Sequence, residues 1–399
     1  MQKCHRENPV LIAGAGPVGL SLALALARRG IPVEVFEKET ELADEERAST
    51  IHPPTLEYLQ EWGVLDPVLA AGAKVDRLQY RERDPDRIIA SFDYSLIAGD
   101  TPFPFRFQLP QNHLTRILRP ALLETGLARI HMGCAVLGHE DHGPEQGVTL
   151  QVSGAAGRKS HRGCCLVGCD GSASPTREQL GMVLEGETLE DRFLLIPTDG
   201  DLRAVMPDLA PTAYIFDPQE WIIVMHLKGF TRVVFRVAPL VDMERATDDE
   251  EVRRRMDRLF GEVPYRILGK SVYRVHQRVA PRFFRGNVIL AGDAAHINNP
   301  AGGMGMNSGI HDAAHLADSL GRILLEGEDQ EKHLGAYEGA RRGFALENVQ
   351  KNTVRNYREL SLQGEAERRA RNADLARTAA DPAAARAFLL RAAMIPDRE

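Results

Sequence analysis

A glycine-rich segment near the N-terminus carries residues that could bind phosphate groups. Gly14, Gly16 and Gly19 form a GxGxxG pattern, and the acid Glu37 follows further along the chain. In such a pattern the first glycine permits a tight turn, the second lets the backbone approach a pyrophosphate, and the third lets a helix pack closely on a strand. Free N–H groups at the helix N-terminus attract phosphate, and the acid accepts hydrogen bonds from a ribose diol. The pattern therefore predicts a dinucleotide site.

The elements around this segment are those that a dinucleotide site needs. Residues 9–16 predict a buried strand and turn, residues 17–30 a helix closed by glycine, and residues 32–38 a second strand. The uncharged stretch from Val10 to Ala27 resembles a signal peptide, but its glycines favour strand, turn and helix. The pattern alone leaves open whether the dinucleotide is NAD or FAD.

Two further segments combine an apolar strand, an acid and a glycine. Residues 290–309, LAGDAAHINNPAGGMGMNSG, contain Asp293 and several glycines, and residues 166–181 contain the pair Asp170-Gly171 before a predicted helix. Ordering glycine costs backbone entropy, and glycine has no side chain to pack. The glycines after Asp293 therefore indicate a backbone that must approach a bound molecule closely rather than a surface linker.

With Arg47 in the sequence RAST, these segments resemble the class A flavoprotein monooxygenases of the para-hydroxybenzoate hydroxylase fold, over most of residues 8–320. The resemblance implies an α/β fold with a Rossmann-like FAD-binding domain, an interleaved antiparallel-sheet substrate domain and C-terminal helices. The implied boundaries are 1–73, 109–184 and 279–330 for the FAD-binding domain, 74–108 and 185–278 for the substrate domain, and 331–399 for the C-terminal helical segment.

The resemblance also implies which residues bind the cofactor. Gln111 would approach the flavin side of FAD, Asp170 would serve a site tied to FAD and the nicotinamide donor, and Asp293 would hydrogen-bond the ribityl chain. Pro300 and residues 302–307 would lie against the isoalloxazine ring. The full implied set is Gly14, Gly16, Pro17, Gly19, Glu37, Lys38, Arg47, Gln111, Asp170, Gly292, Asp293, Pro300, Gly303, Gly305, Met306 and Asn307.

The glycines at 302–307 have an expected physical role. Reduced flavin carries negative charge, and a glycine-rich turn that opens a helix would direct backbone N–H groups at that charge. A Cβ atom in this turn is expected to hold the backbone too far from the ring.

The implied function is that of a flavin-dependent monooxygenase, with FAD as cofactor and NADH or NADPH and O2 as co-substrates. It would hydroxylate an activated phenolic or N-heteroaromatic small molecule through a flavin C4a-hydroperoxide, chemistry that belongs to the cofactor. Baeyer–Villiger oxidation and N-hydroxylation on the same scaffold stay open, as does a non-catalytic flavin-binding redox sensor. No catalytic residue is identified. Tyr214, His226 and Arg236 are candidates for pocket positions, although ordinary sheet positions suit them better.

Composition narrows the partners and the compartment. The chain has 399 residues and a net charge of −7, and its basic clusters are interleaved with acids, which argues against nucleic acid. The five cysteines form neither a disulfide framework nor a zinc-binding spacing, so we expect no metal and a reducing cytoplasm. No other long apolar segment indicates a membrane, and we expect a monomer or homodimer.

Three histidines close to the second glycine-rich segment could be taken for catalytic or metal-binding groups. His296 follows Asp293, and His311 and His315 flank Asp312 at helical spacing. Because no third metal ligand is evident, all three are interpreted as structural polar groups.

Overall fold

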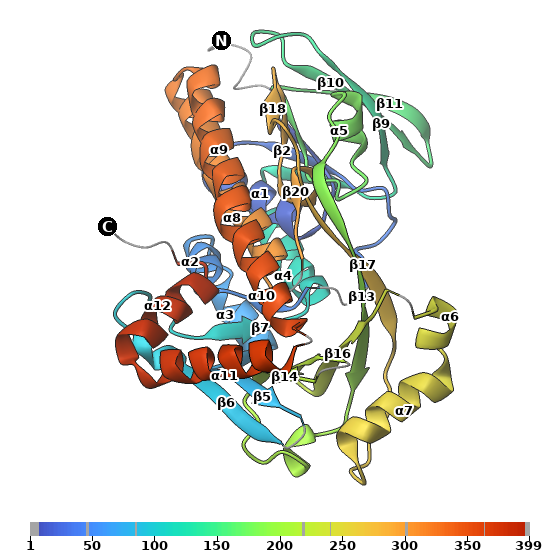
Figure 1. Ribbon diagram of the computed structural model, residues 1–399. Helices are drawn as coiled ribbons and strands as arrows, with labels where there is room; N and C mark the ends of the chain where they lie inside the picture. The colour runs from blue at the N-terminus through green and yellow to red at the C-terminus, as the bar shows by residue number, and fades with distance from the viewer. Residues whose placement is uncertain are drawn as a thin grey trace.

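The computed structural model describes residues 8–44, 48–83, 86–217, 220–239, 241–299, 302–362 and 364–395, with the side chains of residues 275 and 348 excepted. Arg47 and Pro300, both expected at the cofactor, lie outside the described residues. Two large sheets lie one above the other in the view of Figure 1, and a row of helices runs alongside both. The site is formed where these parts meet.

A six-stranded sheet has the order β18-β19-β12-β1-β2-β8. All neighbouring pairs are parallel except β18–β19. Every residue of β1, β12 and β19 is buried, as expected for parallel strands covered on both faces. The strands are β1 (Val10–Ala13), β2 (Val33–Phe36), β8 (Ala128–His131), β12 (Cys165–Gly168), β18 (Phe284–Arg285) and β19 (Val288–Leu290). This is the Rossmann-like sheet that the sequence predicts.

Helices α1 (Pro17–Arg28), α4 (Gln111–Leu123) and α8 (Gly305–Gly321) pack beside this sheet, and α1 contacts both α4 and α8. Helix α8 lies very close to α1, because a Cβ atom at Gly309 would be 2.5 Å from Val18 Cγ2. Only glycine allows that approach, so the position of α8 depends on Gly309.

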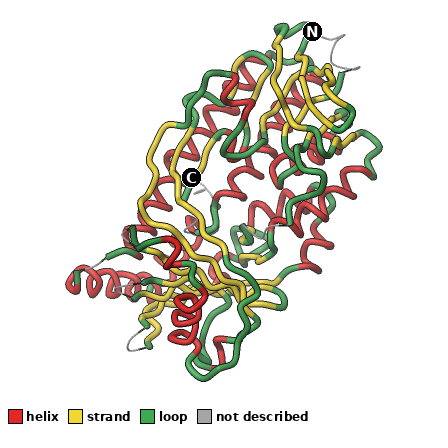
Figure 2. The backbone as a smooth tube through the Cα atoms, turned by 90° about the vertical axis from the view of Figure 1, so that its right-hand side faces the viewer, coloured by secondary structure: helices red, strands yellow, loops and turns green. Residues whose placement is uncertain are grey.

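An eight-stranded sheet has the order β20-β17-β13-β16-β15-β14-β5-β6. Its strands are β5 (Arg77–Glu82), β6 (Arg87–Asp93), β13 (Glu185–Thr198), β14 (Thr212–Phe216), β15 (Ile222–Leu227), β16 (Phe230–Val237), β17 (Ser271–Val279) and β20 (His296–Ile297). The prediction of an antiparallel sheet is correct for all neighbouring pairs except β14 and β5, which are parallel. That exception arises because the β5–β6 hairpin joins the sheet beside β14 from a distant part of the chain. The long strands β13 and β17 belong to the eight-stranded sheet and extend from it toward the six-stranded sheet (Figure 1 and Figure 2).

Two small sheets and several short helices complete this part of the chain. The small sheets have the orders β11-β10-β9 and β3-β7-β4. Their strands are β3 (Thr50–Ile51), β4 (Ala73–Val75), β7 (Arg106–Gln108), β9 (Ala135–Asp141), β10 (Val148–Gly154) and β11 (Gly157–Gly163); the helices are α2 (Pro53–Glu61), α3 (Leu65–Ala71), α5 (Pro175–Gln179), α6 (Met243–Ala246) and α7 (Asp249–Phe260). Strand β7 matters most here, because it lies between the two large sheets.

The last two of the four described C-terminal helices pack on the eight-stranded sheet, whereas the first packs beside α8. The four are α9 (Gln330–Phe344), α10 (Lys351–Leu360), α11 (Glu365–Ala380) and α12 (Pro382–Ala392). Leu375 of α11 and Leu389 of α12 share a hydrophobic core with Phe92 of β6. Among the described residues, no helix is both long enough and apolar enough to cross a membrane.

Candidate cofactor and substrate site

The three glycines of the turn between β1 and α1 differ in their surroundings. Gly14 has a φ of +100°, and a Cβ atom there would lie 2.4 Å from the Cys169 carbonyl oxygen. A Cβ atom at Gly19 would lie 2.0 Å from the Gly14 carbonyl oxygen, whereas nothing lies within 4 Å of the same position at Gly16. Gly14 and Gly19 are therefore required by the fold itself. Gly16, the N-cap of α1 before Pro17, leaves open space at a helix N-terminus.

Glu37 follows β2 and lies beside this turn. Its Oε2 accepts a hydrogen bond from Ala15 N at 2.8 Å, and its Oε1 accepts one from Glu39 N at 3.1 Å. The neighbouring Lys38 is exposed, with its Nζ 3.8 Å from Glu39 Oε1. The tertiary structure thus brings the acid of the second strand against the glycine turn, as a dinucleotide site requires.

Asp293 lies at the end of β19, beside the first turn of α1. The preceding Gly292 has a φ of +61°, and a Cβ atom there would lie 2.9 Å from Val18 Cγ2. The side chain of Asp293 is exposed although Gly292 and Ala294 are buried. The loop therefore presents one carboxylate outward from a tightly packed backbone.

A buried network of charged and polar side chains stabilises the loop that carries Asp293. Asp312 is fully buried; its Oδ2 accepts a hydrogen bond from Gly292 N at 3.0 Å, and its Oδ1 accepts one from Arg341 Nε at 2.7 Å. His296 Nε2 lies 2.7 Å from Asp312 Oδ2. Burial acts to raise the pKa of Asp312, but the charges and hydrogen bonds of His296 and Arg341 hold that pKa well below its usual value. His296 is thus placed as a structural group, as interpreted from the sequence.

His311, also interpreted as structural, lies in the same buried region. Its Nε2 is 3.0 Å from Thr55 Oγ1, and its ring meets that of Tyr58 edge-on. Burial and the nearby Arg341 lower the pKa of His311 to about 3, so its ring is neutral at ordinary pH.

The glycines of the loop before α8 lie close to other side chains of the protein. A Cβ atom at Gly303 would lie 2.7 Å from Thr50 Cβ, and one at Gly305 would lie 3.1 Å from Asn298 Oδ1. Close approach to these side chains already explains both glycines. What the loop offers a ligand is the set of N–H groups in the first turn of α8, which have no partner within the helix. Met306 lies in that turn and is half-buried.

The side chain of Asn307 is also used within the protein. Its Oδ1 accepts hydrogen bonds from His52 N and Thr55 Oγ1, both at 2.8 Å. Its Nδ2 donates to Gly303 O at 2.7 Å and to Thr50 O at 2.8 Å. Asn307 therefore holds the glycine loop against β3 and α2, and only its backbone is left for a cofactor.

Asp170 has a local structural partner. Its Oδ2 accepts hydrogen bonds from Thr176 N at 3.1 Å and Thr176 Oγ1 at 2.7 Å, and its Oδ1 accepts one from Ser174 Oγ. These bonds fix the start of α5. Gln111, expected near the flavin, begins α4 and is half-buried.

Arg177 links two of the predicted segments and was not assigned a role from the sequence. It donates hydrogen bonds to Ser172 O at 2.8 Å and to Ala294 O at 3.1 Å. Burial lowers the pKa of Arg177, while Asp170 and Glu178 oppose that shift. The arginine thereby ties the Asp170 loop to the Asp293 loop. Its position after the Asp-Gly pair was visible, but its partner lies more than a hundred residues away.

A second group that the sequence analysis missed lies away from the glycine turn. Glu34 Oε2 is 3.1 Å from His131 Nε2 and 2.9 Å from His161 Nδ1. The three side chains come from β2, β8 and β11, which are far apart in the sequence and join two sheets. In the structure they form one shared set of hydrogen bonds.

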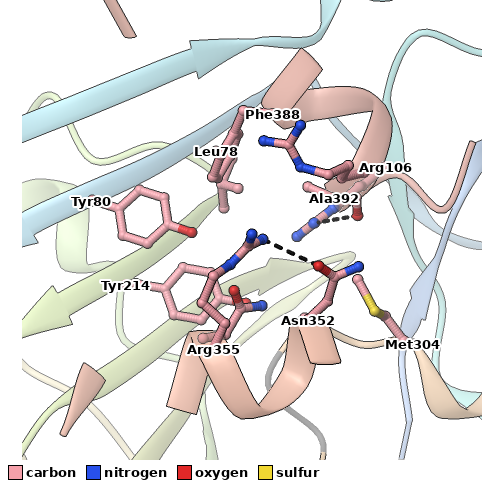
Figure 3. Close-up of a pocket in the computed structure, with 12 residues that line it drawn as sticks. Leu78, Tyr80, Arg106, Tyr214, Met304, Asn352, Arg355, Phe388 and Ala392 are labelled. Carbon is pink, nitrogen blue, oxygen red and sulfur yellow. Dashed lines mark hydrogen bonds between the residues drawn. The ribbon is translucent and has the colours of Figure 1, made fainter. Parts of the chain in front are cut away.

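A small cavity lies between the glycine loop and the eight-stranded sheet (Figure 3). Leu78, Tyr80 and Tyr214 come from the sheet, and the rings of the two tyrosines stack with centroids 5.3 Å apart. The complete lining is Leu78, Tyr80, Arg106, Tyr214, Gly302, Met304, Asn352, Arg355, Asn356, Phe388, Arg391 and Ala392. Half of these residues belong to α10 and α12, which the sequence predicted only as parts of a C-terminal helical segment.

Of the three pocket candidates, Tyr214 lines this cavity, whereas His226 and Arg236 do not. Arg236 Nε lies 2.7 Å from Asp191 Oδ2 in an ion pair. His226 Nε2 is 3.7 Å from Asp201 Oδ1, and burial lowers the pKa of the His226 ring. Alternation along a strand could not show which of these side chains would meet the helices that enclose the cavity.

Comparison with known proteins agrees with this architecture. Residues 7–352 match the family described as FAD binding domain. The chain is 32% identical over 391 residues to para-nitrophenol 4-monooxygenase of Pseudomonas sp. (strain WBC-3), a match that covers 96% of this chain and 94% of the relative. It is also 32% identical over 365 residues to 6-hydroxy-3-succinoylpyridine 3-monooxygenase HspB of Pseudomonas putida (strain DSM 28022 / S16), with 90% of each chain covered.

Solved structures show the same likeness. The crystal structure of p-nitrophenol 4-monooxygenase PnpA from Pseudomonas putida DLL-E4 superposes with a TM-score of 0.90 at 31% identity, covering 98% of this chain and 99% of that one. The flavin-dependent monooxygenase PieE, solved with FAD and substrate, has a TM-score of 0.80 at 26% identity, covering 97% of this chain and 71% of that one. The predictions of fold, cofactor and reaction class are confirmed: the chain belongs to the FAD-binding family of class A flavoprotein monooxygenases and is an FAD-dependent aromatic monooxygenase.

Proposed function

We propose that the protein hydroxylates a small phenolic or N-heteroaromatic compound bound in the cavity between the glycine loop and the eight-stranded sheet. The position of that cavity is the main observation in support. Gly302 and Met304 of the loop form one wall, and the stacked rings of Tyr80 and Tyr214 form another. An aromatic ring suits a pocket with such a wall, because aromatic rings attract one another beyond the area they bury.

The residues around the glycine turn fit FAD. The open space beside Gly16, at the N-terminus of α1, suits a pyrophosphate, and Glu37 lies where a ribose would follow. Asp293 presents an exposed carboxylate from the next loop, suited to the hydroxyl groups of a ribityl chain. Bound FAD supplies electron transfer from NADH or NADPH and the activation of O2.

The chain itself contributes binding, orientation and the exclusion of water. The backbone N–H groups in the first turn of α8 favour negative charge. Residues 74–108 and 185–278 would form the substrate-binding part of the molecule, and residues 331–399 would enclose the substrate from the other side. The relatives' names support phenolic and pyridine substrates, since one acts on para-nitrophenol and another on 6-hydroxy-3-succinoylpyridine.

The test is turnover under isotopically labelled O2 with a panel of phenols and hydroxypyridines. The expected result is substrate-stimulated consumption of NADH or NADPH and one labelled oxygen atom on a ring carbon of the product. Labelled oxygen in an ester or on nitrogen would indicate Baeyer–Villiger oxidation or N-hydroxylation instead. A flavin-loaded protein that incorporates no oxygen with any member of the panel would contradict the proposal.

Replacement of Asp293 by alanine is expected to lower FAD affinity by about tenfold or more, because a hydrogen bond to a charged group contributes about 1.5–3 kcal/mol. The dissociation constant can be measured from flavin fluorescence on titration of the apoprotein. Asp249→Ala is the control, since this exposed carboxylate pairs with Lys270 on a distant surface. Equal FAD affinity in Asp293→Ala and wild type would show that Asp293 does not bind the cofactor.

A further inference from the structure

Arg106 is a buried cation at the substrate cavity. It lies on β7, is 3% exposed and lines the cavity. Its Nη2 donates a hydrogen bond to Ala392 O at 2.8 Å (Figure 3), whereas its Nε is buried without a hydrogen-bond partner. Within the described ranges, no carboxylate forms an ion pair with it.

Three other buried arginines of this chain have carboxylate partners. Arg341 lies 2.7 Å from Asp312, Arg255 lies 3.0 Å from Glu220, and Arg81 lies 2.7 Å from Asp86. A buried charge without a partner is costly, because water no longer solvates it. Arg106 is therefore a cation that pairs with no carboxylate among the described residues, at a place where a ligand is expected to enter.

The groups around Arg106 keep it charged. Burial acts to lower the pKa of Arg106, but the neighbouring hydroxyl groups of Tyr94, Tyr214 and Tyr80 raise it. The Arg106 guanidinium carbon also lies 5.8 Å from the centre of the Tyr94 ring. A guanidinium presents several donors in a plane and matches the oxygen atoms of an anion well.

The rest of the cavity has the same electrostatic character. Arg355 and Arg391 also line it and are exposed, and no aspartate or glutamate belongs to the described lining. Opposite them, Leu78, Tyr80 and Phe388 offer apolar and aromatic surface. A ligand that satisfies both features has an aromatic ring and a negative charge.

We propose that Arg106 binds an anionic oxygen of the aromatic substrate, either a phenolate oxygen or a ring carboxylate, and thereby makes the enzyme selective for aromatic anions. Arg355 and Arg391 attract the anion to the entrance, and Arg106 holds it inside. This inference rests on the proposed function of the cavity.

The test compares anionic ligands with neutral ligands of similar shape on the FAD-loaded protein. One arm uses ionised 4-nitrophenol against 4-nitroanisole, which probes a phenolate; the other uses 4-hydroxybenzoate against 4-hydroxybenzamide, which probes a carboxylate. Dissociation constants are measured by calorimetry for wild type, Arg106→Gln, Arg106→Lys and the control Arg77→Gln, an exposed arginine of β5.

Wild type is expected to bind the anion of at least one pair about tenfold or more tightly than its neutral partner, the effect of one hydrogen bond to a charged group. Arg106→Gln should lose that preference while binding the neutral ligand as before, Arg106→Lys should retain part of it, and Arg77→Gln should behave as wild type. The arm that shows the preference identifies the anionic group.

Either of two results would overturn the inference: no anion preference in wild type, or an unchanged preference in Arg106→Gln. The wild-type comparison keeps the test decisive even if a variant does not fold. Failure of the proposed function is distinguishable, because oxygen incorporation is measured separately. A protein that binds aromatic anions through Arg106 but incorporates no oxygen would refute only the proposed reaction.

Discussion

Gly16→Ala is expected to leave the protein folded and to weaken FAD binding by about tenfold or more, whereas Gly19→Ala is expected to destabilise the fold by about 3 kcal/mol. At Gly19 an added Cβ would lie 2.0 Å from the Gly14 carbonyl oxygen, and that backbone cannot move without disturbing the turn. At Gly16 nothing lies within 4 Å of the added atom, and φ is −71°, an ordinary value for alanine.

The two variants are matched controls for each other, because the same methyl group is added three residues apart. Urea unfolding gives the free energy of unfolding, and flavin fluorescence gives FAD affinity. Gly16→Ala should change stability by no more than about 0.5 kcal/mol. If Gly16→Ala bound FAD as tightly as wild type, the space beside Gly16 would not be the pyrophosphate site.

Asp312→Ala is expected to lower the free energy of unfolding by about 3–5 kcal/mol, since it leaves Arg341 buried without its carboxylate partner. It should also weaken FAD retention, because Gly292 N loses its acceptor and the loop that carries Asp293 loses its support. The control is Asp318→Ala on the same helix; Asp318 is exposed and pairs with Arg29 at 3.3 Å, so its loss should cost less than about 1 kcal/mol.

The depressed pKa of Asp312 also predicts how this effect depends on pH. The carboxyl group binds a proton more readily in the unfolded chain, where its pKa is about 4, than in the folded protein. Its contribution to stability is therefore complete above about pH 4 and is lost as the pH falls toward the folded pKa. The difference in unfolding free energy between wild type and Asp312→Ala should shrink on acidification below that pH. A difference that stayed constant down to strongly acidic pH would contradict the assignment of this charge network.

The sequence by itself determined the dinucleotide-binding half of the protein. Gly14, Gly16, Gly19 and Glu37 lie within one strand–helix–strand unit, so their spacing along the chain already dictates their spacing in space. A similar local pattern, an apolar run followed by an acid, predicted the strand that leads to Asp293. Three such segments in order were sufficient to predict the family, and with it the cofactor and the reaction class.

The glycines before α8 show where this local logic ends. Their lack of a Cβ atom indicated close approach to a bound molecule, yet Gly303 lies against Thr50 and Gly305 against Asn298. A glycine indicates that some group approaches its backbone closely, but the sequence does not identify that group. Asn307 was likewise expected at the cofactor, and its side chain binds the backbone and side chains of β3 and α2.

Only the tertiary structure decided what forms the substrate cavity. Arg106, Tyr214 and Arg355 come from a short strand, a sheet strand and a C-terminal helix, and no periodicity links them. Alternation along a strand shows which face is covered, but the covering segment is set by long-range packing. Nor does the sequence show that Arg106 is buried without a carboxylate partner among the described residues, because the surroundings of a buried charge depend on the packing of the folded chain.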